Sequence, residues 1–519
     1  MKLVITILLT ILSSFVFSQA GDIDTSFGDN GRTITEFEGI SIESQAMAVD
    51  SEDKIVIVGF GEVESDNVIV AVKYLSDGRL DTDFADEGKF IFRISETRNR
   101  CYGVKIDSLN NIYLAGHYRD ENFDNKGFVI KLTTNGTIDS TFATNGIWLN
   151  EEPDTDEQIR EILIQKDGKI LITGTSSIFT NQFEFSTIVI RLNADGTIDD
   201  SFGQNGIAKL LMLESYVPWF AGLNSNDEII TGGFSFIGNS ANPILIKFTE
   251  NGVIDMSFGT DGIQIDDLPL DETGYEIAFT NDDKILLVSS VTTSLGRDFG
   301  LTRYNENGTL DVNFGSNGKI STDFFQGSNV AHSVVIQNDG KIILSGFLGI
   351  TPNHNYAIAR YDSLGFLDSS FGNSGKVSSD FELDDLAIAS AIQSDGKLLC
   401  AGHSRTDDIV GSFSIARYYT ESVSSTSDIS DNLNSVTIIP NPSNGQFRLL
   451  FNLEYSGNTT IDLLTLDGKL LRQLLRKELL FSGEKIIEID LDKTINSGLY
   501  MIRIQTENSL VNQKIVINK

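Results

Sequence analysis

Residues 22–31 read Asp-Ile-Asp-Thr-Ser-Phe-Gly-Asp-Asn-Gly, and variants of this segment recur along the chain. The phenylalanine returns every 56 to 60 residues, at Phe27, Phe84, Phe142, Phe202, Phe258, Phe314 and Phe371. A fixed period of this length is the signature of a repeat architecture. We therefore expect seven structural units of about 57 residues each.

Two further markers accompany each copy in a fixed order. A tight-turn segment of the Asp-Gly-Lys type, followed by a β-branched run, lies at 53–59, 110–116, 167–174, 226–232, 283–289, 339–346 and 395–402. An apolar run then ends in a basic residue, at Lys73, Lys131, Arg191, Lys247, Arg303, Arg360 and Arg417. Short Val- and Ile-rich runs bounded by turn residues are typical of β-strands.

Each unit contains four such runs. In the first unit they lie near Arg32–Phe37, Ala46–Asp50, Ile55–Phe60 and Val68–Tyr74. Four short strands per unit and seven units predict an all-β fold, a seven-bladed β-propeller, with an open solenoid as the alternative. The predicted blades are 32–74, 89–132, 147–192, 207–248, 263–304, 319–361 and 376–418.

The phenylalanine segment predicts an apolar plug between consecutive sheets. Ile23 and Phe27 are four residues apart, so one helical turn would place them on the same face, with Asp24 as its N-cap. Gly28 would end this turn in a left-handed conformation. A ring needs one plug at each junction. Since no copy follows Tyr418, we expect the first copy to fill the junction between blades 7 and 1.

The plug segments, the Asp-Gly-Lys turns and the Arg-Tyr strand ends together resemble the delta-60 family of secreted and surface proteins of bacteria. Leu-Asp-Val-Asn-Phe-Gly-Ser-Asn-Gly at 310–318 is a good copy of the plug. The resemblance covers residues 21–418 and implies a propeller-like fold and secretion. Because the function of that family is poorly defined, the resemblance implies no activity.

The two ends of the chain differ from the repeats. Residues 1–20 combine one Lys, an apolar run and small residues, as in a secretory signal peptide. The run is short for a membrane anchor, and no other long apolar run follows, so we expect no integral membrane segment in the mature chain. Residues 419–432 predict a Ser/Thr-rich linker. The strand-like runs of residues 433–519 predict a small β-sandwich.

The tail carries Asn-Pro-Ser-Asn-Gly at 441–445, Leu-Asp-Gly-Lys at 466–469 and Gly-Leu-Tyr at 498–500. With these motifs it resembles the C-terminal sorting domain of the type IX secretion system of Bacteroidetes. The matching positions are Asn441, Pro442, Gly445, Gly468, Gly498 and Tyr500. The resemblance implies that residues 433–519 bind the type IX machinery and that the protein is secreted, to the extracellular space or the outer-membrane surface. A carbohydrate-binding sandwich is the alternative.

Composition excludes several classes of protein. Among 519 residues, 39 are Lys or Arg and 73 are Asp or Glu, which gives a net charge of -34. Such a surface repels nucleic acid and anionic lipid, so neither is an expected partner. Two cysteines, Cys101 and Cys400, exclude a disulfide scaffold and are expected to be buried free thiols. We expect a monomer.

Catalytic motifs are missing from the sequence. The histidines at 117, 332, 354 and 403 lack the spacing of a metal site on one element, and neither a nucleophile elbow nor a phosphate loop occurs. We therefore expect no enzymatic activity and no cofactor. Calcium is an alternative because Asp is abundant, although the Asp-x-Asp-x-Asp-Gly loop is absent. A glycan-acting enzyme would need carboxylates that converge, or a His, near the ring axis.

One face of the predicted ring varies between blades and is the expected ligand face, because recognition normally resides in variable loops on a rigid scaffold. Its aromatic and polar residues suit a glycan or a protein partner. The candidate residues are Tyr118, Arg119, Phe179, Phe183, Tyr216, Trp219, His354 and Tyr356. The sequence thus favours a secreted, surface-displayed, non-enzymatic binding or adhesion protein. An extracellular glycan-acting enzyme and a structural envelope protein are the alternatives.

Overall fold

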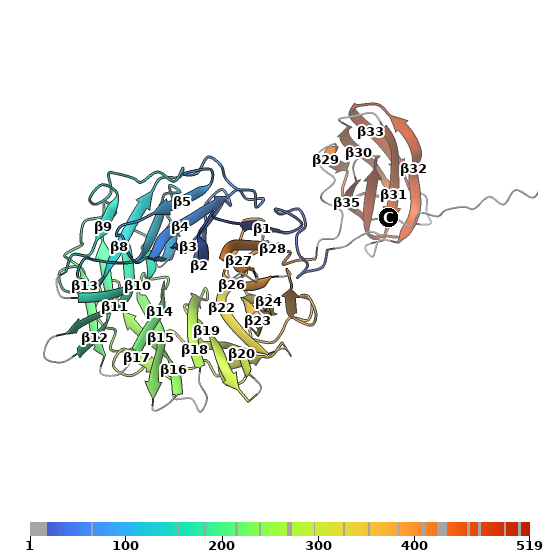
Figure 1. Ribbon diagram of the computed structural model, residues 1–519. Coiled ribbons are helices and arrows are strands. Elements are labelled where there is room, and N and C mark those ends of the chain that lie inside the picture. Colours follow the sequence, from blue (N-terminus) through green and yellow to red (C-terminus); the bar gives the residue numbers. More distant parts are fainter. Residues whose placement is uncertain are drawn as a thin grey trace, which may run out of the picture. The chain divides into compact units, whose positions relative to one another are not determined.

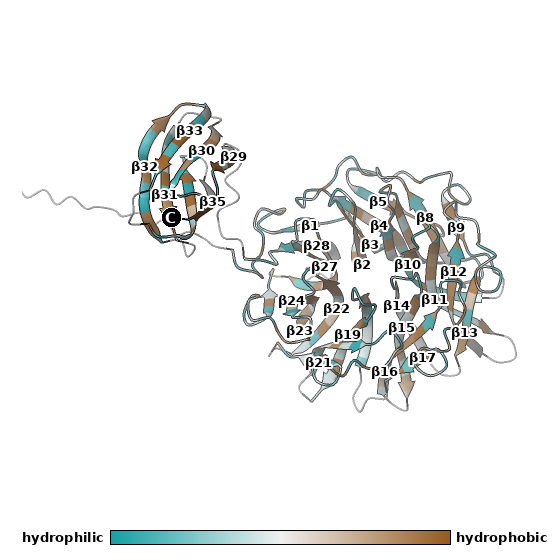
Figure 2. Cartoon of the chain, turned by 180° about the vertical axis from the view of Figure 1, so that it is seen from behind, coloured by the Kyte–Doolittle hydropathy of each residue, from teal (hydrophilic) through white to brown (hydrophobic). Residues whose placement is uncertain are grey.

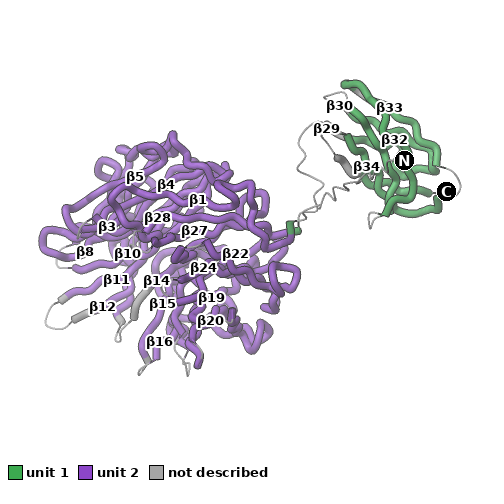
Figure 3. Tube along the Cα trace, turned by 45° about the vertical axis from the view of Figure 1, so that its right-hand side comes forward, with its two compact units in different colours: residues 1–18, 422–519 green, residues 19–421 purple. Residues whose placement is uncertain are grey.

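The computed structural model describes residues 18–63, 66–152, 155–179, 183–212, 216–237, 240–266, 272–294, 296–324, 327–350, 353–381, 383–406, 411–422, 433–453, 457–465, 469–491, 495–506 and 510–518. The chain divides into two compact units, residues 19–421 and residues 422–519 together with 1–18 (Figure 3). Most of the predicted signal peptide (1–17) and of the predicted linker (423–432) lies outside the described residues. Both remain predictions.

Residues 19–421 form seven antiparallel four-stranded sheets, called blades 1 to 7 below (Figure 1). Blade 1 contains β2 (Ser41–Val49), β3 (Ile55–Val63), β4 (Asp66–Tyr74) and β5 (Lys89–Phe92). Blade 2 contains β6 (Asn99–Ile106), β7 (Ile112–Arg119), β8 (Asn125–Leu132) and β9 (Ile147–Leu149). Blade 3 contains β10 (Thr155–Ile164), β11 (Ile170–Phe179), β12 (Phe183–Leu192) and β13 (Ile207–Met212). Blades 4 and 5 contain β14 (Tyr216–Leu223), β15 (Ile229–Ile237), β16 (Ser240–Phe248) and β17 (Ile263–Ile265); β18 (Glu272–Phe279), β19 (Ile285–Thr293), β20 (Gly296–Tyr304) and β21 (Lys319–Thr322). Blades 6 and 7 contain β22 (Ser328–Ile336), β23 (Ile342–Ile350), β24 (Asn353–Tyr361) and β25 (Lys376–Ser379); β26 (Asp384–Ile392), β27 (Leu398–Arg405), β28 (Gly411–Tyr418) and β1 (Arg32–Thr35).

The blades form a closed ring. The first strands β2, β6, β10, β14, β18, β22 and β26 are innermost; each contacts the innermost strand of the next blade, and β26 contacts β2. The N-terminal strand β1 pairs with β28, from Arg32 opposite Ala416 to Thr35 opposite Phe413, and so completes blade 7. The expected all-β propeller is confirmed.

The predicted blade boundaries are wrong by one strand. The run expected to open each blade, such as Arg32–Phe37, contains the outermost strand of the preceding blade. Blade 1 accordingly runs from β2 to β5, over residues 41–92 instead of 32–74. The physical reason is that the plug segment reverses the chain between β4 and β5 of one sheet. It lies within a blade in chain order, although its side chains fill the space between blades.

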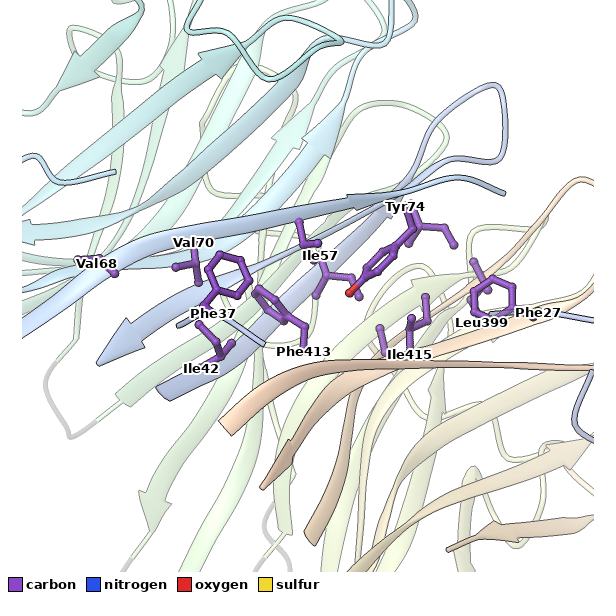
Figure 4. Close-up of a cluster of buried hydrophobic side chains, with 13 residues drawn as sticks. Phe27, Phe37, Ile42, Ile57, Val68, Val70, Tyr74, Leu399, Phe413 and Ile415 are labelled. Atoms are coloured by element: carbon purple, nitrogen blue, oxygen red, sulfur yellow. The ribbon is translucent and has the colours of Figure 1, made fainter. Parts of the chain in front are cut away.

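Each plug phenylalanine lies in an apolar cluster shared by two neighbouring blades. Phe27 is fully buried with Ile57 and Tyr74 of blade 1 and Leu399 and Ile415 of blade 7 (Figure 4). The other six occupy six further clusters, one at each remaining junction. Full burial of one such ring stabilises the fold by about 2–3 kcal/mol. The prediction of one plug per junction is confirmed, including the first copy between blades 7 and 1.

The local structure of the plug differs from the predicted helical turn. The Phe27 N–H donates to the Asp24 carbonyl (3.0 Å), and the Gly31 N–H donates to the Phe27 carbonyl (2.8 Å), so the segment consists of consecutive turns. The Asp24 carboxylate accepts the Ser26 N–H at 3.1 Å and caps the first turn. Gly28 has a φ of 53°, the left-handed conformation expected there.

The basic strand ends neutralise the plug aspartates. Arg417 donates from Nε to Asp24 Oδ2 at 2.8 Å, and its guanidinium lies 4.7 Å from the ring centroid of Phe27. Equivalent ion pairs join Lys131 to Asp139, Arg191 to Asp199, Lys247 to Asp255, Arg303 to Asp311 and Arg360 to Asp368. In the remaining copy, Lys73 pairs with Asp50 and Asp81 pairs with Lys54. Burial raises the pKa of Asp24, but Ser26 and Arg417 outweigh it and lower this pKa to about 2.

The tail unit consists of two sheets. One contains β29 (Leu433–Ile439), β30 (Gln446–Leu453) and β33 (Gly483–Asp490); the other contains β32 (Leu470–Leu480), β31 (Gly457–Leu464), β34 (Gly498–Gln505) and β35 (Leu510–Ile517). Leu449 of the first sheet and Ile461, Ile504 and Ile515 of the second are fully buried in one apolar cluster. Figure 2 shows apolar segments along the strands of both units. Half-exposed and exposed residues dominate strand β32.

Candidate functional site

The innermost strand of every blade carries a β-bulge at the equivalent position. The pairing register shifts by one residue between Ser44 and Ala46 of β2, and likewise in the six other innermost strands. The extra residues are Gln45, Tyr102, Arg160, Trp219, Tyr275, His332 and Ile388. A bulge removes one residue from the regular alternation of the strand and gives its side chain a new direction.

These seven bulge residues all line one cavity of about 260 Å³. Residues from all seven innermost strands contribute to its wall, so the cavity lies on the axis of the ring. We call it the axial cavity. The bulge position is therefore the place where each repeat presents one side chain to a shared central space.

An aromatic belt follows the wall of the axial cavity. The Arg160 guanidinium lies 4.3 Å from the ring centroid of Tyr102 and 5.2 Å from that of Trp219, so it stacks between the bulge residues of the two neighbouring blades. The Trp219 and Tyr275 centroids are 6.2 Å apart, and those of Tyr275 and His332 are 4.4 Å apart. Five consecutive blades thus offer flat, partly exposed groups to the cavity.

Two carboxyl groups, Glu161 and Glu276, lie directly after bulge residues and line the same cavity. Lys105 pairs with Glu161 at 3.3 Å. The Val334 N–H donates to Glu276 Oε2 at 2.8 Å. Burial raises the pKa of Glu276 to about 7, against the hydrogen bonds from Ser333 and Val334. The cavity therefore holds one ion-paired carboxylate and one carboxyl that takes up a proton near neutral pH.

Three histidines near the cavity are held in their neutral form. Burial lowers the pKa of His332 to about 4 and that of His403 to about 3. His403 Nδ1 lies 3.1 Å from Ser44 Oγ. For His117, burial and the charge of Arg160 lower the pKa to about 3. The structure places His332 and His403 in the cavity wall.

The structure brings only part of the predicted ligand face to a site. Trp219 is 38% exposed and lines the axial cavity. Tyr118 and Arg119 are half-buried at the end of β7. His354 is half-buried, with Nδ1 2.7 Å from Asp384 Oδ1. The side chains of Phe179, Phe183 and Tyr216 lie outside the described residues.

Tyr356 requires a correction. Its side chain is 1% exposed, and its hydroxyl lies 2.7 Å from Ser414 Oγ in the neighbouring blade. The residue alternation of β24 turns this ring into the junction between blades 6 and 7, so Tyr356 packs the core and offers no surface to a ligand.

Sequence reasoning missed six of the seven bulge residues. Each lies eight residues before the residue of positive φ in the hairpin turn that follows: Asp53, Asn110, Gly168, Asp227, Asp283, Gly340 and Gly396. Aligning the repeats on this turn would have placed the seven bulge residues in one column. The bulge positions were not predicted, because a bulge has no characteristic residue composition.

The tail motif residues stabilise its last strand. The Asn441 side chain donates to the Lys514 carbonyl and accepts the Val516 N–H, both at 2.9 Å. Pro442 follows it directly, and Gly445 has a φ of 104°. Gly498 pairs with Ile517 at the start of β34, and the Tyr500 hydroxyl donates to the Asn496 carbonyl at 3.0 Å. Gly468 lies outside the described residues.

Comparison with protein families identifies both units. Residues 437–518 match the secretion system C-terminal sorting domain. Residues 110–142, 165–202, 225–258, 280–314 and 337–371 match a β-propeller domain of unknown function (DUF5122). The chain is a β-propeller repeat protein with a type IX sorting domain. The sorting domain indicates that this propeller protein is secreted, to the cell surface or the extracellular space. It also implies an interaction with the type IX machinery.

Solved structures resemble the propeller protein distantly. The polysaccharide lyase Uly1 is 10% identical, with a TM-score of 0.45, over 73% of this chain and 90% of the other. A PL25 ulvan lyase is 10% identical, with a TM-score of 0.44, over 79% and 96%. Sqt1 of Chaetomium thermophilum is 10% identical, with a TM-score of 0.42, over 75% and 98%. No curated protein matches the sequence.

Two further findings concern the described residues alone. Among them, no three His, Cys, Asp or Glu side chains group in a way that could hold a metal ion. In the same ranges, no helix is long and apolar enough to cross a membrane. Cys101 and Cys400 are free and buried, as predicted.

Proposed function

We propose that this secreted propeller binds a glycan in its axial cavity and displays that binding site at the cell surface without enzymatic activity. The observation that carries the proposal is the ring of bulge residues, which sends seven side chains into one space. Four of them form a contacting series, in which the Arg160 guanidinium lies over the rings of Tyr102 and Trp219, and Trp219 meets Tyr275 edge to face. Aromatic faces next to polar groups suit sugars, whose rings have apolar faces and polar edges.

The exposure of Trp219 supports this function. A Trp that only stabilised the core would be buried, yet this side chain stays 38% exposed, whereas Phe220 and Ala221 after it are buried. A bulge holds it out of the regular ladder, next to Pro218. Maintaining an exposed ring at the centre of a fold is understandable where a ligand covers it.

The experiment is a glycan array probed with the purified full chain, with and without calcium. The expected result is saturable binding to a defined group of glycans, reduced at least tenfold by Trp219→Ala. Tyr118→Ala tests the outer loops in the same assay and is expected to weaken binding less. Absence of binding to every glycan would refute the proposal and favour a protein partner or a structural role.

A glycan-cleaving enzyme is the second candidate, and Glu276 favours it. A carboxyl with a pKa near 7 can donate a proton at neutral pH, and Glu161 supplies a second carboxylate in the same cavity. Any glycan that binds on the array should then be incubated with the full chain and with Glu276→Gln. If new reducing ends appeared with the native chain and not with the variant, the function would be glycan cleavage instead of binding alone.

A further inference from the structure

Four arginines gather where blades 1 to 3 meet. Arg98 and Arg100 flank Asn99 at the start of β6, and Arg119 ends the adjacent strand β7. The Arg119 N–H donates to the Arg98 carbonyl at 2.8 Å, so these two backbones are directly joined. Arg160 is the bulge residue of β10 in the next blade. We call these four residues the arginine cluster.

The arginine cluster is continuous with the axial cavity. The Arg100 guanidinium lies 4.7 Å from the ring centroid of Phe60, and this ring lies 5.9 Å from that of Tyr102. Tyr102 in turn stacks against Arg160 inside the cavity. Arg160 is thus the member of the cluster that lines the cavity, and Arg100 is connected to it through the rings of Phe60 and Tyr102.

None of the four arginines forms an ion pair within the part of the chain that the structure describes. Their hydrogen bonds go to neutral groups: Arg100 Nε donates to the Asn67 side chain, and Arg160 donates to that of Gln158. The Nε of Arg119 is buried and has no hydrogen-bond partner. All four side chains are half-buried. Charged groups in this condition are costly unless a counter-charge arrives.

One carboxylate acts on the cluster without forming an ion pair with it. Asp156 attracts Arg98 at longer range, but Asn125 binds both of its oxygens at 3.1 Å. Burial and the charges of Arg119 and Arg100 lower the pKa of Arg98. The arginines thus repel one another in the unliganded chain.

We propose that the arginine cluster binds the carboxylate or sulfate of an acidic glycan whose sugar rings pack in the axial cavity. This inference rests on the proposed function and names its ligand class. A guanidinium offers paired N–H donors that match both anions. The net charge of -34 repels acidic ligands from most of the surface. The unpaired arginine cluster is therefore a place where an acidic glycan can bind.

The test is calorimetric titration of the full chain with three probes: oligogalacturonate, its neutral methyl ester, and a sulfated dextran oligomer. We expect one acidic probe to bind at least tenfold more tightly than the ester, and the better acidic probe tells carboxylate from sulfate. Arg119→Gln and Arg160→Gln should each weaken its binding about tenfold, the usual effect of one charge-assisted contact. The matched control is Arg405→Gln, because Arg405 is half-buried and already pairs with Glu43 at 3.5 Å. It should change affinity less than twofold.

A stability readout separates recognition from a structural role. Removing one of several mutually repelling charges should leave the thermal unfolding midpoint of Arg119→Gln unchanged or higher. A clear fall in that midpoint would make Arg119 a structural residue and overturn the inference.

Equal binding of the ester and the acid, or no binding of either acidic probe, would also overturn it. If the glycan array still showed neutral ligands, the proposed function would stand without the acidic class. An array without any ligand would remove both.

Discussion

The plug junctions and the axial cavity belong to the same seven repeats, and they treat charge in opposite ways. At the junctions, the base that ends the third strand has a carboxylate partner in every blade, as Arg417 has Asp24. In the cavity, Arg160 has aromatic neighbours and no carboxylate partner among the described residues. The junctions pair their charges within the chain, whereas the cavity holds one ion pair, Lys105 with Glu161, and leaves Arg160 without one.

The two regions also differ in how far the repeats agree. Every junction must fill the same space with one phenylalanine and satisfy one buried or half-buried aspartate, so both residues return in each blade. The bulge position faces the cavity instead of a packed neighbour, and six different residue types occupy it. Agreement between repeats marks the positions that hold the ring together. At the bulge position, a change of residue type alters the cavity wall instead of a packed core.

The largest expected effect comes from breaking one junction. Arg417→Met removes the closer of the two basic partners of the fully buried Asp24 and leaves Lys397 at 3.3 Å, which should lower the free energy of unfolding by about 3 kcal/mol, the low end for breaking a buried pair. Urea unfolding followed by Trp fluorescence measures it, because both tryptophans, Trp148 and Trp219, lie in the propeller.

Arg405→Met is the control for this experiment. Arg405 belongs to the same blade, but its ion pair with Glu43 is partly exposed, and its loss should cost less than about 1 kcal/mol. Equal effects of the two substitutions would contradict the assignment of the plug charges to stability.

A smaller effect, of opposite sign, is expected in the cavity. Glu276 has a pKa of about 7 in the folded chain against an ordinary value of 4.5, so the folded state holds this proton more tightly. Its contribution to stability is present below pH 4.5 and is lost as the pH rises to about 7. Glu276→Gln cannot lose a proton and should be more stable than the native chain by about 2–3 kcal/mol at pH 8, and equally stable at pH 4.5.

The groups that face Glu276 define the control. They are Lys105 of β6, Glu161 of β10, and Ser333 with the Val334 N–H of β22. Glu161→Gln removes the ion pair with Lys105 and should bring no gain at pH 8. The free energy of unfolding of both chains is measured by urea unfolding between pH 4.5 and 8. If it changed with pH in the same way in the native chain and in Glu276→Gln, the pKa of Glu276 would not be raised in the folded chain.

The sequence predicted the fold well because the junction chemistry is local and repeated. Phe27, Asp24 and Gly28 each have a role that short-range geometry requires, and seven copies make the pattern unmistakable. The blade boundaries failed for a reason that local patterns do not contain. Whether Arg32–Thr35 belongs to the sheet before or after it depends on pairing with Ala416 and its neighbours, nearly 400 residues away.

The site was less accessible to sequence reasoning. Trp219 was selected as a loop residue, whereas it lines the cavity from a strand, and Tyr356 was selected although it is buried. Strand alternation alone cannot place Trp219, because one bulged residue reverses the direction of every side chain that follows. The raised pKa of Glu276 depends on burial and on Glu161 in another blade, which no sequence pattern reveals.

The smallest expected change in stability accompanies the clearest expected change in binding. Trp219→Ala removes a partly exposed bulge side chain, so the free energy of unfolding should change by less than about 1 kcal/mol. Glycan affinity should fall about tenfold, as at other aromatic contacts in binding sites. Ile388→Ala is the matched variant at the equivalent bulge of blade 7, where no stacked aromatic series exists among the described residues. It should weaken binding less than twofold. Calorimetry on both variants measures the two losses of glycan affinity. Equal losses would mean that the bulge residues only enclose the cavity and that the Trp219 ring does not recognise the glycan. The contrast between the repeated junctions and the cavity would then not locate the binding site.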